Sequence, residues 1–267
     1  MARPFLKWAG GKSRLLAQYS PHFPSSFARY HEPFVGSAAV FFELEPPDAV
    51  LADSNAALID CYTVARDHVE PLIRQLERLQ ARHSRKQFYA MRDRYNGDRV
   101  NPVERAALFI YLNRTCYNGL YRVNRSGRFN VPAGRYLRPR ICNPERLRAA
   151  SAALKASRLV SRRFGACVAD VGRGDFVYID PPYHRLNAGS FTSYTAEGFG
   201  EPEQRELATV VDRLHAAGSR VMVSNSDTPL IRELYAAHRI VPIRAARAIN
   251  SSPGGRGQVG EVLILNY

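Results

Sequence analysis

Short apolar runs alternate with amphipathic stretches at both ends of the chain. The apolar runs predict strands that end near Glu32 and that cover 49–52, 176–180, 220–225, 240–243 and 261–266. Apolar residues at three-to-four spacing predict one helix through Val64 to Leu79 and another over 203–217. Strands that alternate with helices in this way are typical of an α/β sheet.

The middle of the chain has a different pattern. Asn101 has the properties of a helix N-cap, because a proline and a glutamate follow at the first and third helical positions. The sequence Asn-Arg-Ser-Gly at 124–127 predicts the turn of a hairpin, with the glycine supplying a positive φ. We therefore expect a core domain of residues 1–57 and 143–267 and an inserted, mainly helical domain over 58–142.

The composition excludes several classes of protein. Of the 267 residues, 45% are hydrophobic and 23% charged, which excludes a wholly disordered chain, a collagen-like repeat and a coiled-coil rod. No apolar run approaches the roughly 18 residues of a membrane-spanning helix, and the first residues lack the apolar stretch of a secretory signal. The four cysteines form no CxxC pair, so we expect no zinc ribbon, no disulfide framework and a cytoplasmic location.

The positive charge is concentrated in one part of the chain. There are 38 Lys and Arg against 24 Asp and Glu, a net charge of +14. Residues 101–165 contain 14 basic and two acidic residues, so this segment alone carries +12. Such a concentration indicates a surface that binds a polyanion, and arginine suits phosphate because its planar group binds in a bidentate manner. Solvated charges on an arginine-rich protein are the alternative, which leaves the clustering unexplained.

The sharpest motif is Asp180-Pro181-Pro182-Tyr183, directly after an apolar strand. Ligands of α/β sheets bind outside the carboxyl ends of the strands. Two successive prolines fix the backbone, so the Asp180 carboxylate and the Pro181 carbonyl become rigid acceptors that match the two hydrogens of an aromatic amine. The Tyr183 ring offers a face on which a flipped base can stack. The alternative is a Pro-Pro turn that only ends a strand.

A second group of residues indicates a nucleoside cofactor. Glu32 and Asp53 each follow a strand and lie 21 residues apart, close to the spacing that places an acid on a ribose. Ala38 stands where a second glycine would let a pyrophosphate approach, which disfavours a dinucleotide but not a nucleoside without phosphates. An ordinary strand–turn–helix is the alternative.

A glycine-rich loop lies between Trp8 and Lys12. Its end, Gly-Lys-Ser, resembles the end of a P-loop, but Leu6 stands where that motif needs a glycine and no strand precedes it. We therefore reject an ATPase site. The loop can instead lay an aromatic ring on an adenine and place a cation near a carboxylate.

Taken together, these motifs carry a family resemblance over nearly the whole chain. The sequence resembles the DNA adenine-N6 methyltransferases of the Dam type, the alpha group of the D12 class. The stretches that carry it are FLKWAGGK (5–12), EPFVG (32–36), LADSN (51–55), YLNRTCYNGLYRVNRSGRFNVPAGRY (111–136), DPPY (180–183), FTSY (191–194), SNSDT (224–228) and RAINSSPGG (247–255). The sequence departs from the family at Ala38, where a glycine is common, and at Tyr121, where near relatives have a small residue.

The resemblance implies a fold, a cofactor and a catalytic motif. The fold is a Rossmann-like methyltransferase sheet with an inserted DNA-recognition domain that carries a β-hairpin. The cofactor is S-adenosylmethionine and no metal is needed. The implied catalytic residues are Asp180, Pro181, Pro182 and Tyr183, with Phe191 and Tyr194 at the pocket wall. The implied cofactor-binding residues are Trp8, Lys12, Glu32, Phe34, Gly36, Asp53 and Asp180.

The resemblance also implies how the target is recognised. The partner is double-stranded DNA, the target adenine is flipped out of the duplex, and the favoured sequence is GATC. Leu120, Arg122 and Pro132 are expected at base edges and Tyr117 and Asn118 near the flipped base. The residues expected on phosphates are Arg114, Arg125, Arg128 and Arg135. We expect a nucleoid-associated monomer that binds no membrane. The alternatives are a silent DNA-binding protein on this scaffold and an RNA adenine methyltransferase.

Overall fold

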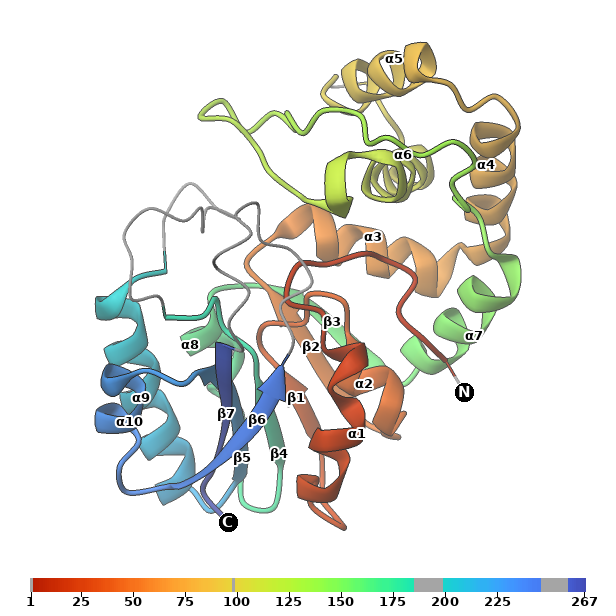
Figure 1. Ribbon diagram of the computed structural model, residues 1–267. Helices are drawn as coiled ribbons and strands as arrows, with labels where there is room; N and C mark the ends of the chain where they lie inside the picture. The colour runs from red at the N-terminus through yellow and green to blue at the C-terminus, as the bar shows by residue number, and fades with distance from the viewer. Residues whose placement is uncertain (1, 98, 185–198, 246–258) are drawn as a thin grey trace.

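The core of the protein is one twisted sheet. The computed structural model describes residues 2–97, 99–184, 199–245 and 259–267 (Figure 1). In these residues seven strands lie in the order β3-β2-β1-β4-β5-β7-β6. β7 runs antiparallel to both β5 and β6, and the other pairs are parallel. The strands are β1 (Tyr30–Glu32), β2 (Ala49–Asp53), β3 (Ser157–Ser161), β4 (Phe176–Ile179), β5 (Arg220–Ser226), β6 (Arg239–Ala245) and β7 (Val259–Leu265).

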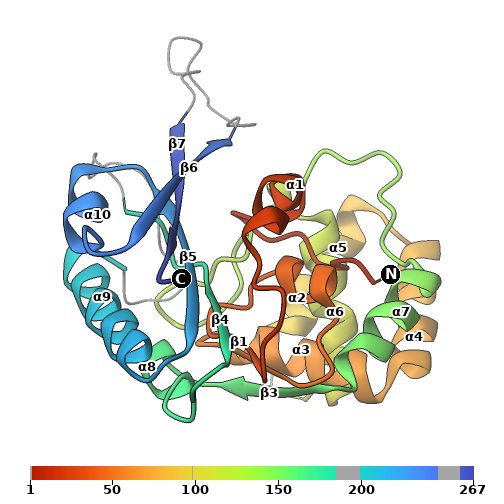
Figure 2. The same cartoon turned by 90° about the horizontal axis from the view of Figure 1, so that it is seen from below.

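Helices cover both faces of this sheet, which confirms the predicted α/β class (Figures 1 and 2). One face packs on α8 (Phe164–Cys167), α9 (Glu201–Ala216) and α10 (Pro229–Leu234). On the other side lie α1 (Leu16–Tyr19), α2 (Ala39–Leu44), α3 (Ala56–Asp67) and α7 (Pro144–Leu154). Short 3-10 helices cover Lys12–Arg14, Ser20–His22 and Tyr117–Gly119.

All six strands expected from the apolar runs are present, and β3 is the one the sequence did not predict. β3 is an edge strand that pairs only with β2 among the described strands. Its sequence, Ser-Arg-Leu-Val-Ser, has two adjacent apolar residues between polar ones. Because an edge strand is partly solvated, it does not need the continuous apolar run that marks a central parallel strand.

The prediction of one continuous helix through Val64 to Leu79 is wrong. The structure has two helices there, α3 and α4 (Val69–Ala81), with a break at His68, whose φ is −133° and ψ is 42°. Pro71 gives the physical reason, because a proline inside a continuous helix removes a hydrogen bond and clashes with the preceding turn. The break places Pro71 in the first turn of α4, where proline is tolerated.

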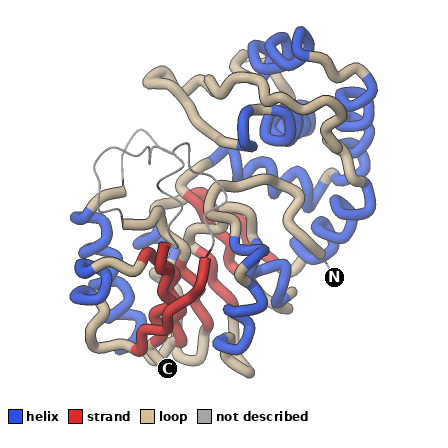
Figure 3. Tube along the Cα trace, in the orientation of Figure 1, coloured by secondary structure: helices blue, strands red, loops and turns tan. Residues whose placement is uncertain are grey.

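Between β2 and β3 the chain is mostly helical (Figure 3). α5 (Arg85–Tyr95) and α6 (Pro102–Thr115) pack with α3 and α4 around one continuous apolar core that extends to the sheet. The Asn101 side chain caps α6 by accepting a 3.0 Å hydrogen bond from the Glu104 amide, as the sequence predicts.

The expected hairpin follows α6. The Asn124 amide donates to the Arg128 carbonyl at 2.9 Å, and Gly127 has a φ of +71°. The side chain of Asn96, at the end of α5, binds both the amide and the carbonyl of Phe129 and so fixes the hairpin to the helices. The segment projects over the side of the molecule at which the parallel strands end (Figure 1).

Candidate active site

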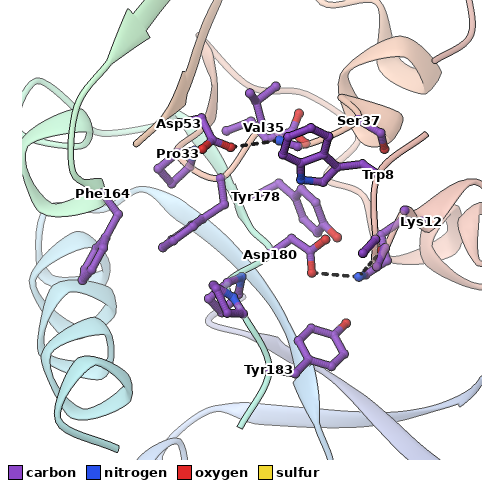
Figure 4. A pocket seen from close by; sticks show the side chains of 18 of the residues that line it. Trp8, Lys12, Pro33, Val35, Ser37, Asp53, Phe164, Tyr178, Asp180 and Tyr183 are labelled. Carbon is purple, nitrogen blue, oxygen red and sulfur yellow. Dashed lines mark hydrogen bonds and ion pairs between the residues drawn. The ribbon is translucent and has the colours of Figure 1, made fainter. Parts of the chain in front are cut away.

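A cavity of about 770 Å³ opens at the carboxyl ends of the parallel strands (Figure 4). This is the edge where α/β sheets bind their ligands. All seven residues expected at the cofactor and all four of the Asp180–Tyr183 motif line this one cavity. Most of the wall comes from residues 8–12, 32–37, 53–55, 163–164 and 180–183, with Tyr178, Phe199, Glu203 and Glu261.

Asp180 is held in an ion pair on the floor of the cavity. Its Oδ1 lies 2.8 Å from the Lys12 Nζ (Figure 4). The same oxygen accepts a 2.7 Å hydrogen bond from the Ser224 hydroxyl. Lys12 is only 4% exposed, and it also donates to the Gly10 carbonyl at 2.7 Å. The ammonium group lies 4.6 Å from the centre of the Tyr183 ring. The buried lysine charge is therefore balanced by the carboxylate that directly follows β4.

Tyr183 is oriented by a carboxylate from the last strand. Its hydroxyl donates to Oε2 of Glu261 at 3.1 Å, and the Tyr19 hydroxyl contacts the same oxygen at 3.4 Å. Burial raises the pKa of both Tyr183 and Glu261. The phenol therefore stays neutral and donates at ordinary pH. Sequence reasoning missed Glu261, although it is an isolated acid at the start of an apolar strand.

The backbone after Asp180 is fixed from two other elements. Gln204 of α9, which is fully buried, donates from Nε2 to the Pro182 carbonyl at 2.9 Å. Its Oε1 accepts from Asn225 of β5 at 3.0 Å, and Asn225 Oδ1 accepts from the His184 amide at 3.1 Å. Sequence reasoning gave neither residue a role. Asn225 lies in the SNSDT motif, whereas the sequence around Gln204 has no such signal.

The turn after β1 needs a glycine at position 36. Gly36 has a φ of +44°, and a Cβ there would lie 2.8 Å from Cδ1 of Trp8. Its amide donates to the Asp53 carboxylate at 3.2 Å, and its carbonyl accepts from the Tyr62 hydroxyl at 2.9 Å. Ala38, at the N-cap of α2, also has a positive φ, of 56°. Glycine adopts this left-handed conformation with less strain than alanine. A glycine would therefore fit position 38 better than the alanine of this chain.

Two further carboxyl groups in the wall have raised pKa values. Oδ1 of Asp53 accepts from the Asn55 amide at 2.9 Å, yet burial raises the pKa of Asp53 to about 6. Glu32 is buried and accepts from the Tyr30 hydroxyl at 2.8 Å, and burial raises its pKa well above the ordinary value. Burial therefore makes both carboxyl groups easier to protonate than exposed ones.

Three phenylalanines form an apolar part of the wall. The Phe34 ring centre lies 5.4 Å from that of Phe164 and 5.8 Å from that of Phe199. Phe34 was expected here, whereas Phe164 begins α8 and Phe199 lies in a loop before α9, both without a recognisable motif. The two residues Phe191 and Tyr194, which were expected at the pocket wall, lie outside the described residues.

The residues expected to contact DNA lie apart from the cavity, at the end of α6 and along the hairpin. Tyr117, at 52% exposed, is among the most exposed large side chains of the described chain. Arg122 is half-buried and donates from Nε to the Asn130 side chain at 2.8 Å. Arg114 donates twice to the Arg140 carbonyl, at 3.1 and 2.9 Å. Leu120 is half-buried, and the others are exposed: Asn118, Arg125, Arg128, Pro132 and Arg135.

The described residues contain neither a candidate metal site nor a candidate membrane-spanning helix. No group of three or more His, Cys, Asp or Glu side chains within residues 2–97, 99–184, 199–245 and 259–267 is arranged to hold a metal ion. Over the same ranges, none of the helices has the length and apolar character needed to cross a membrane. The four cysteines are buried and unpaired with one another.

Comparison with known proteins identifies the family. Residues 8–249 match the model of the D12 class N6 adenine-specific DNA methyltransferases. The chain is 41% identical to the Type II methyltransferase M1.LlaDCHI of Lactococcus lactis subsp. cremoris, over 99% of this chain and 95% of the relative. It is 39% identical to the Type II methyltransferase M.MjaIII of Methanocaldococcus jannaschii, over 99% of each chain.

A third relative is the DNA adenine methylase of Escherichia coli (strain K12), 35% identical over 98% of this chain and 95% of the relative. These matches agree with a site at the carboxyl ends of parallel strands in which an Asp-Pro-Pro-Tyr segment lines the cavity. The chain is an adenine-specific DNA methyltransferase and belongs to the D12 class.

Proposed function

We propose that this enzyme transfers a methyl group from S-adenosylmethionine to N6 of adenine within GATC in double-stranded DNA, after flipping the base out of the helix. The observation that carries the proposal is the cavity in which Asp180, backed by Lys12 and Ser224, lies beside the Tyr183 ring. A duplex does not expose adenine N6 to such a recess, so the base has to leave the stack.

The residues of the cavity fit S-adenosylmethionine. Its volume of about 770 Å³ is in the range of small-molecule sites. The Asp53 carboxylate suits the two ribose hydroxyls, and Trp8 and Phe34 supply aromatic surface for an adenine ring. Gly36 keeps the turn open where a side chain would displace Trp8. When bound, this cofactor supplies an electrophilic methyl group on a sulfonium.

The catalytic motif acts by positioning and by polarisation. The Asp180 carboxylate and the Pro181 carbonyl accept hydrogen bonds from the two N6–H groups, which localises the nitrogen lone pair that the ring would otherwise delocalise. Because Ser224 and Lys12 hold the carboxylate, it is organised before the adenine enters. The Tyr183 ring, anchored by Glu261, provides the face on which the flipped base stacks.

We assign residues 1–57 and 143–267 to a catalytic domain and 58–142 to a target-recognition domain. The basic character of residues 101–165 and the exposed arginines of the hairpin support this division. Leu120, Arg122 and Pro132 read base edges, with Arg122 bidentate to guanine. Tyr117 and Asn118 lie near the flipped base, and the phosphate contacts come from Arg114, Arg125, Arg128 and Arg135.

The test is methylation of a GATC-containing plasmid with S-adenosylmethionine, read by methylation-sensitive digestion and single-molecule sequencing. Methylated adenine confined to GATC supports the whole proposal. Methylated adenine in another sequence overturns the GATC assignment and keeps the reaction. No methylation of DNA, with binding retained at a stated salt concentration, favours a silent scaffold, and preferential methylation of RNA in competition favours an RNA enzyme.

Donor binding should weaken as the pH falls through about 6. Burial raises the pKa of Asp53 to about 6, and the ribose hydroxyls need the ionised carboxylate as their acceptor. Affinity for S-adenosylhomocysteine, measured by calorimetry, should therefore be constant above pH 7 and about tenfold lower at pH 5. The Asp53→Asn variant should bind weakly with little pH dependence. Equal wild-type affinity at pH 5 and 7.5 would contradict the role of Asp53.

Arg122→Ala should relax recognition of the guanine. Loss of a bidentate contact to a base should lower kcat/KM on GATC by about 10- to 100-fold and lower it less on sites with a substituted first base. Arg125→Ala is the matched control, because loss of a phosphate contact should weaken binding to all sequences alike and reduce the salt dependence. If the Arg122→Ala enzyme kept the wild-type preference for GATC, Arg122 would not be a base-reading residue.

A further inference from the structure

Trp8 packs against an aromatic side chain of the hairpin. The Tyr121 ring stacks on the Trp8 indole with centroids 5.9 Å apart and planes 22° apart. Phe109 of α6 stacks on the same indole at 6.4 Å and 23°. Tyr121 also contacts Phe109 at 5.3 Å and Phe129 across the hairpin at 5.8 Å. Tyr121 therefore faces inward, toward the apolar core, rather than out with the neighbouring arginines.

The other side of Trp8 belongs to the cavity. The indole lines the cavity wall and lies against Gly36, so closely that a Cβ at this glycine would be 2.8 Å from Cδ1. Gly36 in turn donates to Asp53. A continuous set of contacts thus runs from the hairpin through Tyr121 and Trp8 to the turn and the carboxylate expected to hold the donor.

In the hairpin, Tyr121 lies directly beside the arginine that is proposed to read a base. It is the residue directly before Arg122, whose backbone carbonyl accepts from the Asn130 amide at 3.1 Å and whose side chain also bonds to Asn130. A shift of this side of the hairpin that brings Arg122 to a base edge would also move the Tyr121 ring. Since side chains in a packed core move together, the indole follows.

We propose that Tyr121 is a positioning residue that couples the DNA-reading hairpin to the methyl-donor pocket through Trp8. The inference rests on the proposed function, because it takes the cavity as the donor site and the hairpin as the DNA-reading element. Binding of DNA fixes Tyr121, and Tyr121 fixes the indole wall of the donor pocket. Thermodynamic linkage then requires each ligand to increase affinity for the other by the same factor.

The experiment measures donor binding in the absence of turnover. The dissociation constant of S-adenosylhomocysteine is determined by calorimetry with and without a saturating GATC duplex. In the wild type, DNA should tighten binding by about fivefold or more. In Tyr121→Ala, the ratio of the dissociation constant without DNA to that with DNA should be close to one. Tyr121→Phe should keep the wild-type ratio, because the ring makes the contact. Tyr89→Ala is the matched control: Tyr89 is a half-buried tyrosine of α5 whose ring contacts do not include Trp8.

Fluorescence provides a second readout, because Trp8 is the single tryptophan of the chain. Duplex DNA without donor should change Trp8 emission in the wild type and in Tyr121→Phe, and leave it unchanged in Tyr121→Ala. Thermal unfolding checks that the variants are folded. If the alanine variant is unfolded, Tyr121→Leu replaces it, because leucine keeps apolar volume at this position without the aromatic ring.

The outcomes separate this proposal from the proposed function. A wild-type ratio near one, or a ratio kept in the folded Tyr121→Ala and Tyr121→Leu variants, overturns the coupling. If the wild type still methylates GATC and binds S-adenosylhomocysteine, the proposed function survives that result. If the wild type does not bind S-adenosylhomocysteine at all, the donor assignment and the coupling fail together.

Discussion

Replacing Asp180 by alanine should lower kcat by about 10³-fold or more while duplex DNA binding at fixed salt stays near that of the wild type. In the proposed mechanism the carboxylate polarises N6, and without it the nitrogen lone pair would stay delocalised in the ring. The hairpin and its arginines are distant in sequence from this substitution, so the proposed phosphate contacts should persist. Radiolabelled methyl incorporation measures the first effect and a filter-binding or anisotropy titration the second.

The control for this experiment concerns Lys12. Asp180→Ala removes the ion-pair partner of a lysine that is 4% exposed, so unfolding of the variant must be measured beside its activity. Asp180→Asn keeps the shape of the side chain and should lose most of the activity as well, because the amide is a weaker acceptor. An Asp180→Ala enzyme that turns over near the wild-type rate would end the catalytic assignment.

Replacing Asn113 by alanine should reduce the free energy of unfolding by about 2–4 kcal/mol. Asn113 is 2% exposed and joins three segments. Its Oδ1 accepts from the Lys7 amide at 2.8 Å, and its Nδ2 donates to the carbonyls of Lys7 at 2.6 Å and Gly119 at 3.1 Å. Alanine leaves these buried backbone groups without their partner. Since Lys7 precedes Trp8, donor affinity should fall as well.

Urea denaturation measures this loss of stability, provided that the wild type and the variant have the same m-value. Thr209→Ala is a suitable comparison, because Thr209 is exposed on α9 and its hydroxyl only contacts the Arg205 carbonyl of its own helix. That change should stay within about 0.5 kcal/mol. A loss below about 1 kcal/mol for Asn113→Ala would mean that water or a relaxed backbone replaces the three bonds.

Much of the site could be predicted because the chemistry follows directly after strands. Glu32 ends β1, Asp53 ends β2 and Asp180 follows β4. Parallel strands of one sheet bring their carboxyl ends to one edge, so residues distant in sequence had to meet there. The alternation of apolar runs and helices predicted the α/β sheet for the same local reason.

The remainder depends on packing between distant segments, which a single sequence does not display. Gln204 reaches the Pro182 carbonyl only because α9 lies against the end of β4. Phe199 joins Phe34 from a loop, and Tyr121 turns inward because Phe109 and Trp8 offer it an apolar surface. The break at His68 was missed since the apolar spacing continues across it.

On the ribosome, β7 is synthesised after all the other described strands. β7 lies between β5 and β6, and it is the only described strand beside β6. It also carries Glu261, which anchors Tyr183. A nascent chain can fold its earlier segments as they emerge, including the basic hairpin, but the catalytic face stays incomplete until residues 259–265 have left the exit tunnel. We therefore expect methylation to begin only after β7 has left the tunnel, and binding of nucleic acid by the hairpin to begin earlier.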